Sequence, residues 1–365
     1  MILMNDFKAE SPEIHDAMLD AVKRVLDSGW YVLGNEVVSF EKQWAGVCDA
    51  PYAIGCGNGM DAIEIGLRSL NIGPGDEVIT TPMTAFATVL AILRTGATAV
   101  LADINPSTGL LCPESVRRCI SSQTKAVLVV HLYGQIREME QWEELCKESG
   151  IVLLEDCAQA HLAKWNGKVA GTFGLFGAYS FYPTKNLGAI GDGGALITSS
   201  HEIAKRASAL RNYGQTVRYY HPELGMNSRL DEIQAALLSV RLQWLKQYTD
   251  RRCAIGSVYN GGIINPLIEK LAAPQQLDSH VYHLYVLKCK ERDRLVSYLN
   301  DFGIASLIHY PVPIHRQEPC RDLVADPVGL SNAENFATEC LSIPCHPQMS
   351  DDDVEKIIIK INNFS

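Results

Sequence analysis

One stretch of the sequence, residues 50–159, constrains the fold most, because strand-length apolar runs alternate there with amphipathic runs of helical spacing. Near-continuous apolar strands are typical of a parallel sheet that is buried on both faces. The alternation therefore predicts an α/β fold with helices on both faces of the sheet. The expected strands lie in YAIGCG (52–57), GDEVITT (75–81), TAVLADI (98–104), KAVLVVHLYG (125–134) and IVLLEDCAQ (151–159). The expected helices between them span residues 59–73, 85–96, 112–120 and 138–150.

The sequence as a whole predicts an N-terminal helix followed by a large and a small domain. Residues 1–30 hold a helix, with Ser11 as N-cap, proline at its first position and Gly29 at its end, and we expect it to pack with the small domain. Residues 31–249 form the large domain, which also contains neighbouring strands at 177–182 and 193–200 and a long helix from residue 229 to about 248. Residues 250–365 form a smaller α+β domain, with a half-buried strand at 280–289 and helices at 291–303 and 351–364.

The bulk composition excludes several classes of protein. The net charge of −10 argues against a nucleic-acid-binding protein, although local positive charge can still serve a phosphorylated ligand. No apolar run approaches membrane-spanning length, and the first residues do not resemble a signal peptide. The 11 cysteines contain no CxxC pair, which favours reduced thiols and a cytoplasmic location.

Two adjacent acids end the fifth expected strand. In IVLLEDCAQAH, four apolar residues lead into Glu155 and Asp156. Ligands of open α/β sheets bind outside the carboxyl ends of the strands. Because neighbouring strand residues point to opposite faces, we expect only one of the two acids to face a site. A surface acid or a helix cap is an equally good reading of one such residue.

The first expected strand leads through AIGCGNGMDA into a helix. Glycines at such a turn let backbone N–H groups and the positive helix end approach a phosphate. The run lacks the GK[ST] of a Walker A motif and resembles the dinucleotide-binding GxGxxG only loosely. An ordinary strand–helix turn would look the same.

A single lysine stands in SFYPTKNLGAIGDGG, just after an apolar strand. Lys185 lies between Pro183 and Gly188, so it has no regular helix or strand face from which to project. Lysines at strand ends commonly reach out to water. A desolvated lysine at this position would instead have a lowered pKa and would attack carbonyl groups. A reactive lysine, a carboxylate and an anion cradle together are what pyridoxal phosphate requires.

At these residues the chain resembles the DegT/DnrJ/EryC1/StrS family of sugar aminotransferases over nearly its whole length. The resemblance implies the aspartate aminotransferase fold, that is, pyridoxal phosphate fold type I, in a homodimer with shared active sites. It is carried, in family order, by GNGMDAIEIGL, GDEVITTP, HLYGQ, EDCAQAH, FGAYSFYPTKNLGAIGDGGALIT, LRNYG, GMNSRLDEIQAALL and HYPVPIH.

The resemblance implies roles around the cofactor ring. Lys185 would hold the cofactor aldehyde covalently and later move a proton. Asp156 would keep the pyridinium nitrogen protonated, and Gln159 would meet the phenolic oxygen. The family commonly has TF.AT where this chain has PMTAFAT, so Phe86 is the candidate to stack on the ring. Either the loop shifts to bring Phe86 there, or another side chain covers the ring.

The resemblance also implies how the cofactor phosphate would be held. Gly59 and Met60 would offer backbone N–H groups, and the Ser180 hydroxyl would lie beside them. Asn227 would reach the phosphate from the other subunit. Arg229 would serve either the dimer or the substrate, or would form only a structural ion pair.

Several further residues are candidates for the sugar pocket, although a lone histidine is more often structural. Tyr182 bears on the carbon that is aminated, because family members that aminate C-4 often carry histidine there. FYPTKN is more similar to members that aminate a 3-keto sugar. The other candidates are His161, His309, Tyr310 and His315.

The resemblance implies transamination of a keto group on a nucleotide-linked deoxy sugar, with a dTDP-3-keto-6-deoxyhexose as substrate and glutamate as amino donor. Amination at C-4 is the alternative, and a non-enzymatic regulatory relative is a third reading. The presence of Lys185 speaks against that relative and against the dehydratase branch, which has histidine at this position. An NAD-binding Rossmann enzyme would not explain YPTKN. No metal is expected.

Overall fold

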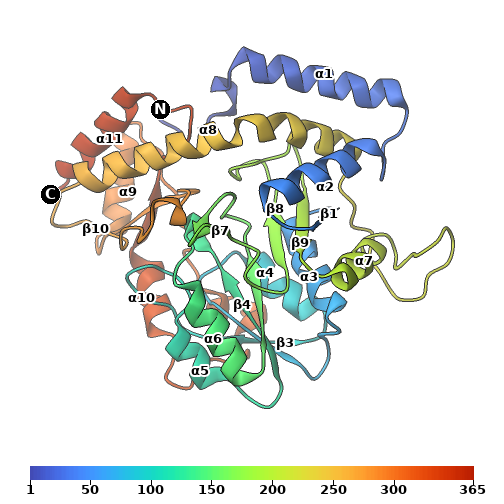
Figure 1. The fold of residues 1–365 in the computed structure, drawn as a ribbon. Coiled ribbons are helices and arrows are strands. Elements are labelled where there is room, and N and C mark those ends of the chain that lie inside the picture. The colour runs from blue at the N-terminus through green and yellow to red at the C-terminus, as the bar shows by residue number, and fades with distance from the viewer.

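The computed structural model describes residues 1–365, and its centre is a seven-stranded sheet of order β1-β9-β8-β5-β4-β2-β3 (Figure 1). Neighbouring strands are parallel from β8 to β3, and only β9 runs antiparallel to both of its neighbours. The prediction of a mostly parallel sheet is therefore confirmed. The strands are β1 (Tyr52–Cys56), β2 (Glu77–Thr80), β3 (Thr98–Leu101), β4 (Thr124–Val130), β5 (Val152–Asp156), β8 (Gly177–Ser180) and β9 (Gly194–Thr198).

Helices cover both faces of this sheet, because successive strand residues feed two separate cores. Ile79 and Leu153 pack into one core with α2, α5 and α6, whereas Val78 and Leu154 pack into the other with α3, α4 and α7. All four strand residues are at most 6% exposed, which explains why these strands are apolar at every position. The helices are α2 (Asn35–Val47), α3 (Gly59–Ser69), α4 (Phe86–Arg94), α5 (Pro113–Cys119), α6 (Met139–Ser149) and α7 (His201–Leu210).

The smaller part of the molecule is a three-stranded antiparallel sheet with its own core. The long helix α8 (Glu232–Gly262) reaches it from the large domain, since Leu238 packs in the large-domain core and Tyr259 in the small one. The predicted boundary at residue 249 therefore falls inside one continuous helix. The remaining elements are β10 (Glu269–Lys270), β11 (Tyr285–Lys288), β12 (Cys340–Ile343), α9 (Arg292–Asp301), α10 (Ser331–Glu339), α11 (Asp351–Asn362), the hairpin of β6 (Lys164–Trp165) and β7 (Lys168–Val169), and 3-10 turns at 7–9, 132–134, 277–279, 314–316 and 318–320.

The N-terminal helix does not pack where the sequence led us to expect. Helix α1 (Pro12–Ser28) is capped by Ser11 and ends at Gly29, as predicted, but it lies along the first half of α8 (Figure 1). Its buried Ala21 and Val25 pack against Ala236, Leu237 and Val240 of that helix. The small domain is contacted instead by the first residues of the chain, where the Ile2 backbone N–H donates to the Gly303 carbonyl at 2.7 Å.

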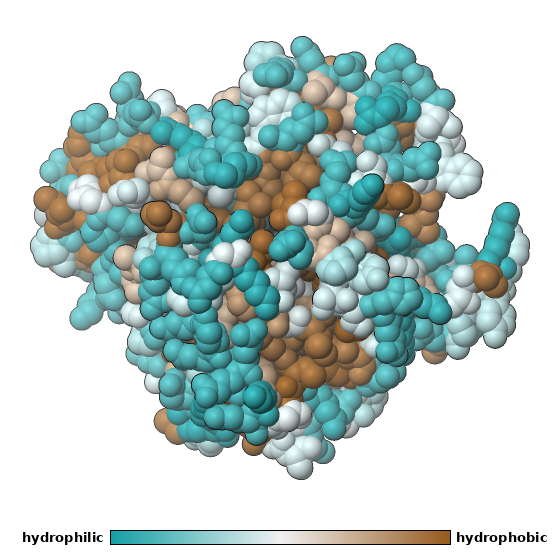
Figure 2. All heavy atoms as spheres, viewed as in Figure 1, coloured by the Kyte–Doolittle hydropathy of each residue, from teal (hydrophilic) through white to brown (hydrophobic).

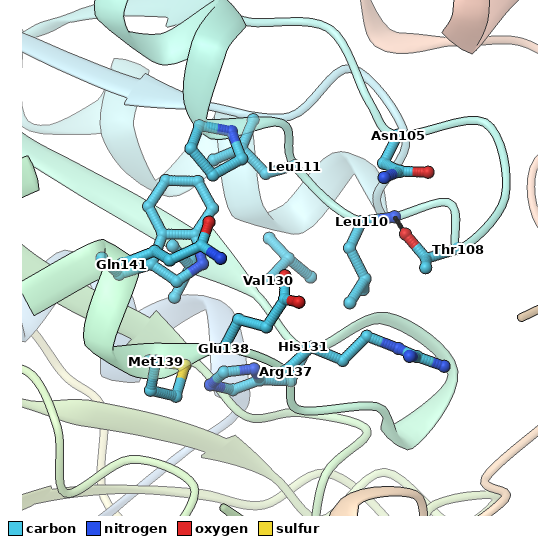
Figure 3. A pocket seen from close by; sticks show the side chains of 13 residues that line it. Asn105, Thr108, Leu110, Leu111, Val130, His131, Arg137, Glu138, Met139 and Gln141 are labelled. Atoms are coloured by element: carbon cyan, nitrogen blue, oxygen red, sulfur yellow. Dashed lines mark hydrogen bonds between the residues drawn. The ribbon is translucent and has the colours of Figure 1, made fainter. Parts of the chain in front are cut away.

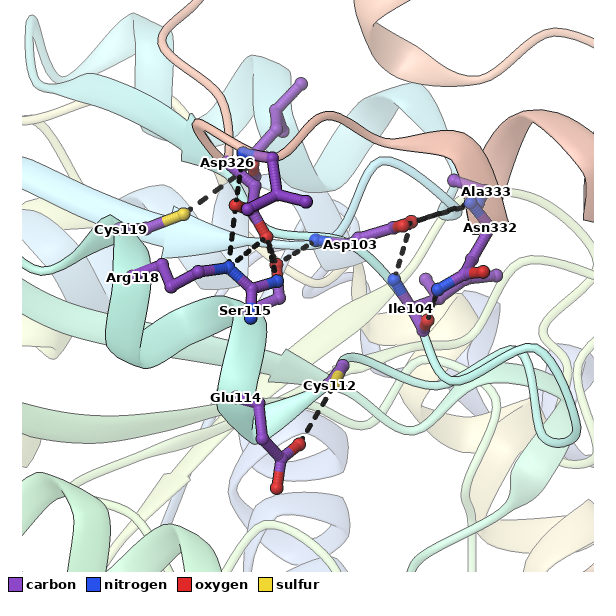
Figure 4. A network of polar contacts seen from close by, with 12 residues as sticks. Asp103, Ile104, Cys112, Glu114, Ser115, Arg118, Cys119, Asp326, Asn332 and Ala333 are labelled. Carbon is purple, nitrogen blue, oxygen red and sulfur yellow. Dashed lines mark hydrogen bonds and ion pairs between the residues drawn. The ribbon is translucent and has the colours of Figure 1, made fainter.

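A polar network fixes the segment before α10 to the large sheet (Figure 4). The carboxylate of Asp103, after β3, accepts the backbone N–H groups of Asn332 and Ala333 at 3.0 and 2.9 Å and so caps the start of α10. Asp326 pairs with Arg118 of α5, with an Nε–Oδ1 distance of 2.9 Å, and accepts the Ser115 hydroxyl. These contacts place residues 326–333 on the large domain before the chain returns to β12.

Candidate active site

The two acids at the end of β5 turn in opposite directions, as alternation along a strand requires. The Asp156 carboxylate accepts the Thr88 hydroxyl at 2.8 Å and the Ala158 backbone N–H at 3.0 Å. Glu155 lies 2.9 Å from Nε2 of His131 and is fully buried. Its oxygens also accept three backbone N–H groups at 2.7–2.8 Å, from Gly171, Phe173 and Gly174. Glu155 is thus fully engaged in the structure of the sheet, and Asp156 is the acid available to a ligand.

Lys185 lies in a closed turn after β8, which we call the lysine loop (residues 181–189). The Ala189 backbone N–H donates to the Phe181 carbonyl at 2.7 Å and closes the loop, and the Lys185 N–H donates to the Tyr182 carbonyl at 2.8 Å. Gly188 is required, because a Cβ there would lie 2.3 Å from the Pro183 carbonyl oxygen. The sequence pattern of proline, lysine and glycine therefore encodes one compact turn.

The Lys185 side chain is half-buried, and its amine is the enclosed end. Burial lowers the pKa of the Lys185 amine to about 8, and the nearby negative charge of Asp156 raises that pKa in part. The lysine and the carboxylate therefore lie within electrostatic range of each other, near the carboxyl ends of β5 and β8. The lowered pKa increases the fraction of neutral amine near neutral pH, and the neutral amine is the form that attacks carbonyls.

The start of α3 lies tightly against the end of β8. A Cβ at Gly59 would lie 2.7 Å from Cβ of Ser180, so only glycine fits at this position. The N-cap Asn58 accepts the Asp61 backbone N–H at 2.9 Å, while the Met60 side chain packs into the apolar core. Gly59 and Met60 can therefore offer only backbone groups here, beside the Ser180 hydroxyl, which suits the bound phosphate of a cofactor.

Gln159 and two residues of the late HYPVPIH segment lie around the same space. Oε1 of Gln159 accepts the Tyr133 backbone N–H at 2.6 Å, and Nε2 lies 3.4 Å from the Tyr310 hydroxyl. Burial, and secondarily the charge of Asp156, raises the pKa of Tyr310 to about 12. Burial and the charge of Lys185 lower the pKa of His309 to about 4. Both late residues therefore lie within electrostatic range of the lysine and carboxylate.

His315, by contrast, is engaged elsewhere. Its Nε2 lies 3.0 Å from Glu334 of α10, which also pairs with Arg316. No hydrogen bond joins His315 to the residues around Lys185, although it was predicted with His309 and Tyr310 from the same motif. The structure gives His315 the contacts of a structural residue.

Four more of the predicted residues lie toward the surface. Phe86 begins α4 and is 36% exposed, and Tyr182 is 53% exposed. Asn227 is exposed and has no side-chain hydrogen bond within its own chain. Arg229 donates to the Asn212 side chain at 3.0 Å, and its guanidinium carbon lies 5.1 Å from the centre of the Tyr213 ring. Phe86, Tyr182 and Asn227 are therefore open to a ligand or another chain, whereas Arg229 is engaged within its own chain.

Three contributors to the site carry no role in the sequence prediction. Thr88 has the position of a core residue in the helical pattern, and Asn186 and His283 stand in otherwise unremarkable loop and strand runs. His283 is buried, and Asn186 lies 3.2 Å from it. The position of Asn186 directly after the lysine was the one local signal that could have identified it.

Two features elsewhere do not add a second site. His131, Glu155 and Cys157 present ligand atoms within 4.8 Å of one another, but the Glu155 oxygens already accept their full set of donors. The cavity beside β4 in Figure 3 contains none of the predicted site residues. Arg137, on its wall, is engaged by the Ala272 and Ala273 carbonyls.

The residues at this sheet edge fit pyridoxal phosphate. An amine with a lowered pKa lies within range of a carboxylate that a hydroxyl holds in place. The glycine at the start of α3 lets the helix end approach Ser180 closely, where a side chain would collide with Ser180. The fold and the site thus define a pyridoxal phosphate-dependent enzyme.

The comparisons with known proteins agree with this class. Residues 12–362 match the DegT/DnrJ/EryC1/StrS aminotransferase family, and the chain belongs to that family. It is a pyridoxal phosphate-dependent aminotransferase, and the predicted family, fold class, enzyme class and cofactor are confirmed.

Individual relatives align with this chain over nearly their whole length. The chain is 42% identical to the dTDP-3-amino-3,6-dideoxy-alpha-D-galactopyranose transaminase of Aneurinibacillus thermoaerophilus, covering 100% of this chain and 99% of the relative. It is 39% identical to the pleiotropic regulatory protein of Geobacillus stearothermophilus, covering 99% and 98%. Among solved structures, S. venezuelae DesV in complex with ketimine intermediate superposes with a TM-score of 0.95 at 40% identity, covering 99% of this chain and 97% of DesV.

Proposed function

We propose that this enzyme transfers an amino group to the C-3 keto group of a dTDP-linked 6-deoxyhexose. The observation that carries the proposal is the enclosed Lys185 amine beside Asp156, in a chain 42% identical to a dTDP-3-amino sugar transaminase. Tyr182 in the lysine loop also favours C-3 over C-4, because C-4 members often carry histidine there. The kinship to a pleiotropic regulatory protein keeps a regulatory function as the second candidate.

Pyridoxal phosphate, when bound, supplies an electron sink for bonds at the carbon that carries the nitrogen. Lys185 would hold the cofactor and would later move the proton, since its lowered pKa lets the free amine both accept and release a proton near neutral pH. Asp156, which Thr88 holds in place, would pair with the ring nitrogen. We assign Gln159 to a hydrogen bond with the phenolic oxygen of the cofactor ring. We assign Phe86 to stacking on one face of that ring.

We assign the phosphate to the backbone N–H groups of Gly59 and Met60 and to the Ser180 hydroxyl. The tight contact between Gly59 and Ser180 supports this assignment, because it brings the helix end and the hydroxyl together. His309 and Tyr310 border the sugar, for both lie within range of Lys185 or Asp156. His315 is the weakest of the sugar-pocket assignments, since Glu334 already engages it.

The active enzyme is a homodimer in which Asn227 and Arg229 of one subunit complete the site of the other. The surface supports this proposal at the arm of residues 213–224, which stands clear of the body (Figures 1 and 2). The arm exposes apolar and aromatic side chains and leads directly into Asn227. These side chains are Val217, Tyr219, Tyr220 and Leu224.

The amino donor is glutamate, and the enzyme works in the cytoplasm. All 11 cysteines are free, as expected in a reducing compartment. No helix of the structure is both long and apolar enough to span a membrane.

The substrate is tested by incubating the enzyme and cofactor with matched 3-keto and 4-keto dTDP-6-deoxyhexoses and glutamate. Mass spectrometry and NMR of the products then locate the new nitrogen. The proposal predicts a 3-amino product and formation of 2-oxoglutarate. A 4-amino product would contradict the C-3 assignment, and no amino sugar from any member of the panel would favour the regulatory candidate.

A further inference from the structure

His283 is a buried histidine beside the lysine loop to which the proposed function gives no role. It is 7% exposed and lies in the segment that enters β11 of the small domain. That segment is fixed on both sides. The Val281 backbone N–H donates to the Gly134 carbonyl at 3.0 Å, and Arg252 of α8 donates to the Tyr282 and His283 carbonyls at 3.4 and 3.3 Å. His283 therefore stands on a rigid junction between the two domains.

Asn186, the residue after the lysine, connects the lysine loop to this junction. Its Nδ2 donates to the Val281 carbonyl at 3.3 Å, and its Oδ1 lies 3.2 Å from Nδ1 of His283. The reverse amide orientation would place two acceptors against each other at Val281. Because an amide oxygen only accepts hydrogen bonds, Nδ1 of His283 must carry the proton.

The surroundings of His283 keep its ring neutral. The charged and titratable groups facing it are Lys185 from the lysine loop, Arg252 from α8, and His161 and His309. Burial first, and then the charge of Lys185, lowers the pKa of His283 well below its usual value. A protonated ring would add a further cation to a space that already holds two. The ring is therefore present as the Nδ1–H tautomer throughout the physiological pH range.

We infer that His283, through the hydrogen bond from its Nδ1–H to Asn186, is a positioning residue that fixes the lysine loop on the junction between the domains. The inference rests on the proposed function only in taking Lys185 as the reactive amine. His283 acts through Asn186, so it orients the lysine without contacting the reacting atoms. The adjacent position of Asn186 means that a change in this bond moves the backbone of Lys185 directly.

The first test uses variants of the apoprotein and pyridoxal, which lacks the phosphate and so reports on the lysine alone. The rate of pyridoxal capture by Lys185 is followed by absorbance. His283→Leu removes the donor and should slow capture about tenfold, as expected for one lost hydrogen bond. His283→Asn places an amide N–H close to the position of Nδ1 and should restore capture to within about twofold of the wild-type rate.

A double variant tests whether His283 acts through its hydrogen bond to Asn186. If His283 acts through Asn186, the double variant His283→Leu/Asn186→Leu should capture pyridoxal no more slowly than Asn186→Leu alone. Additive losses, a wild-type rate in His283→Leu, or failure of His283→Asn to restore capture would overturn the inference.

The second test needs no variant and is independent of cofactor chemistry. NMR of protein labelled with ¹⁵N in its histidine rings should show His283 as the Nδ1–H tautomer, with no titration between pH 8 and 5. An Nε2–H tautomer or a titrating ring would overturn the inference even if the enzyme is a transaminase. If wild-type protein captured neither pyridoxal nor pyridoxal phosphate, the proposed function would fail, and the NMR spectrum would still decide the role of His283.

Discussion

The hydroxyl of Thr88 donates to Oδ2 of Asp156 at 2.8 Å, across 68 residues of sequence, and so joins the first turn of α4 to the end of β5. Thr84 lies 2.8 Å from the same hydroxyl. Since the Thr88 proton is committed to the carboxylate, the Thr84 hydroxyl must be the donor in that second bond. A chain of two hydroxyls thus fixes the carboxylate that faces Lys185.

Replacing Thr88 tests this support. Thr88→Val keeps the shape but removes both hydroxyl bonds, and it should lower the free energy of unfolding of the apoprotein by about 1–3 kcal/mol. Thr88→Ser retains the hydroxyl and is the matched control. Urea denaturation measures both variants against wild type, and a Thr88→Val variant as stable as wild type would show that the hydrogen bonds contribute nothing.

The lysine amine should titrate far below an ordinary lysine. Trinitrobenzenesulfonate modification of Lys185 in the apoprotein, read by mass spectrometry against pH, should have a midpoint near pH 8. Asp156→Asn removes the negative charge that raises this pKa, so the midpoint should move lower. A midpoint near pH 10.4, that of a free lysine, would contradict an enclosed amine.

The shared site predicts complementation between subunits. Asn227→Ala should weaken retention of the cofactor phosphate, with a dissociation constant raised about tenfold for one lost hydrogen bond. Mixing Lys185→Ala with Asn227→Ala protein should then yield heterodimers with one intact site.

Activity measured after subunit exchange, at a limiting cofactor concentration and against each parent variant alone, checks this prediction. Asn300→Ala, at an exposed position of α9 whose side chain makes no hydrogen bond, serves as a surface control. Absence of recovered activity in confirmed heterodimers would place Asn227 in the site of its own chain.

Buried His161 should make stability depend on pH. Its Nε2 lies 3.0 Å from the Ser180 carbonyl, and burial, with the charge of Lys185, lowers its pKa to about 3. On acidification, His161 is therefore protonated near pH 6.5 in the unfolded chain but only near pH 3 in the folded protein. The contribution of neutral His161 to the free energy of unfolding is therefore fully present above pH 6.5. Below that pH it falls by about 1.4 kcal/mol per pH unit.

His161→Phe isolates that contribution. The variant should be less stable than wild type at pH 7, because the bond to Ser180 is lost. The difference should shrink between pH 6 and 5, because phenylalanine does not titrate. Urea unfolding at a series of pH values gives the slope of unfolding free energy against pH for each protein. Equal slopes for wild type and variant would show that His161 is protonated in the folded protein.

The sequence predicted the strands of the large sheet because their burial on both faces makes them apolar throughout. It also predicted Asp156 at the end of one strand and Lys185 shortly after another, and β5 and β8 do bring the two to the same edge of the sheet. It could not reveal Thr88, whose position in α4 follows the same spacing as its core neighbours and whose partner is 68 residues away. The packing of α1 was predicted wrongly, since its small apolar stripe suits any flat helix face, and only the tertiary structure selects the first half of α8.

The central claim is that the Lys185 amine binds pyridoxal phosphate, and the absorption spectrum tests it most directly. Purified protein is supplied with the cofactor, freed of excess and scanned before and after addition of glutamate. Wild type should show the near-visible band of lysine-bound cofactor, and glutamate should shift it, whereas Lys185→Ala should lack the stable band. Wild-type protein with no such band, or a Lys185→Ala variant with the same band, would contradict the claim.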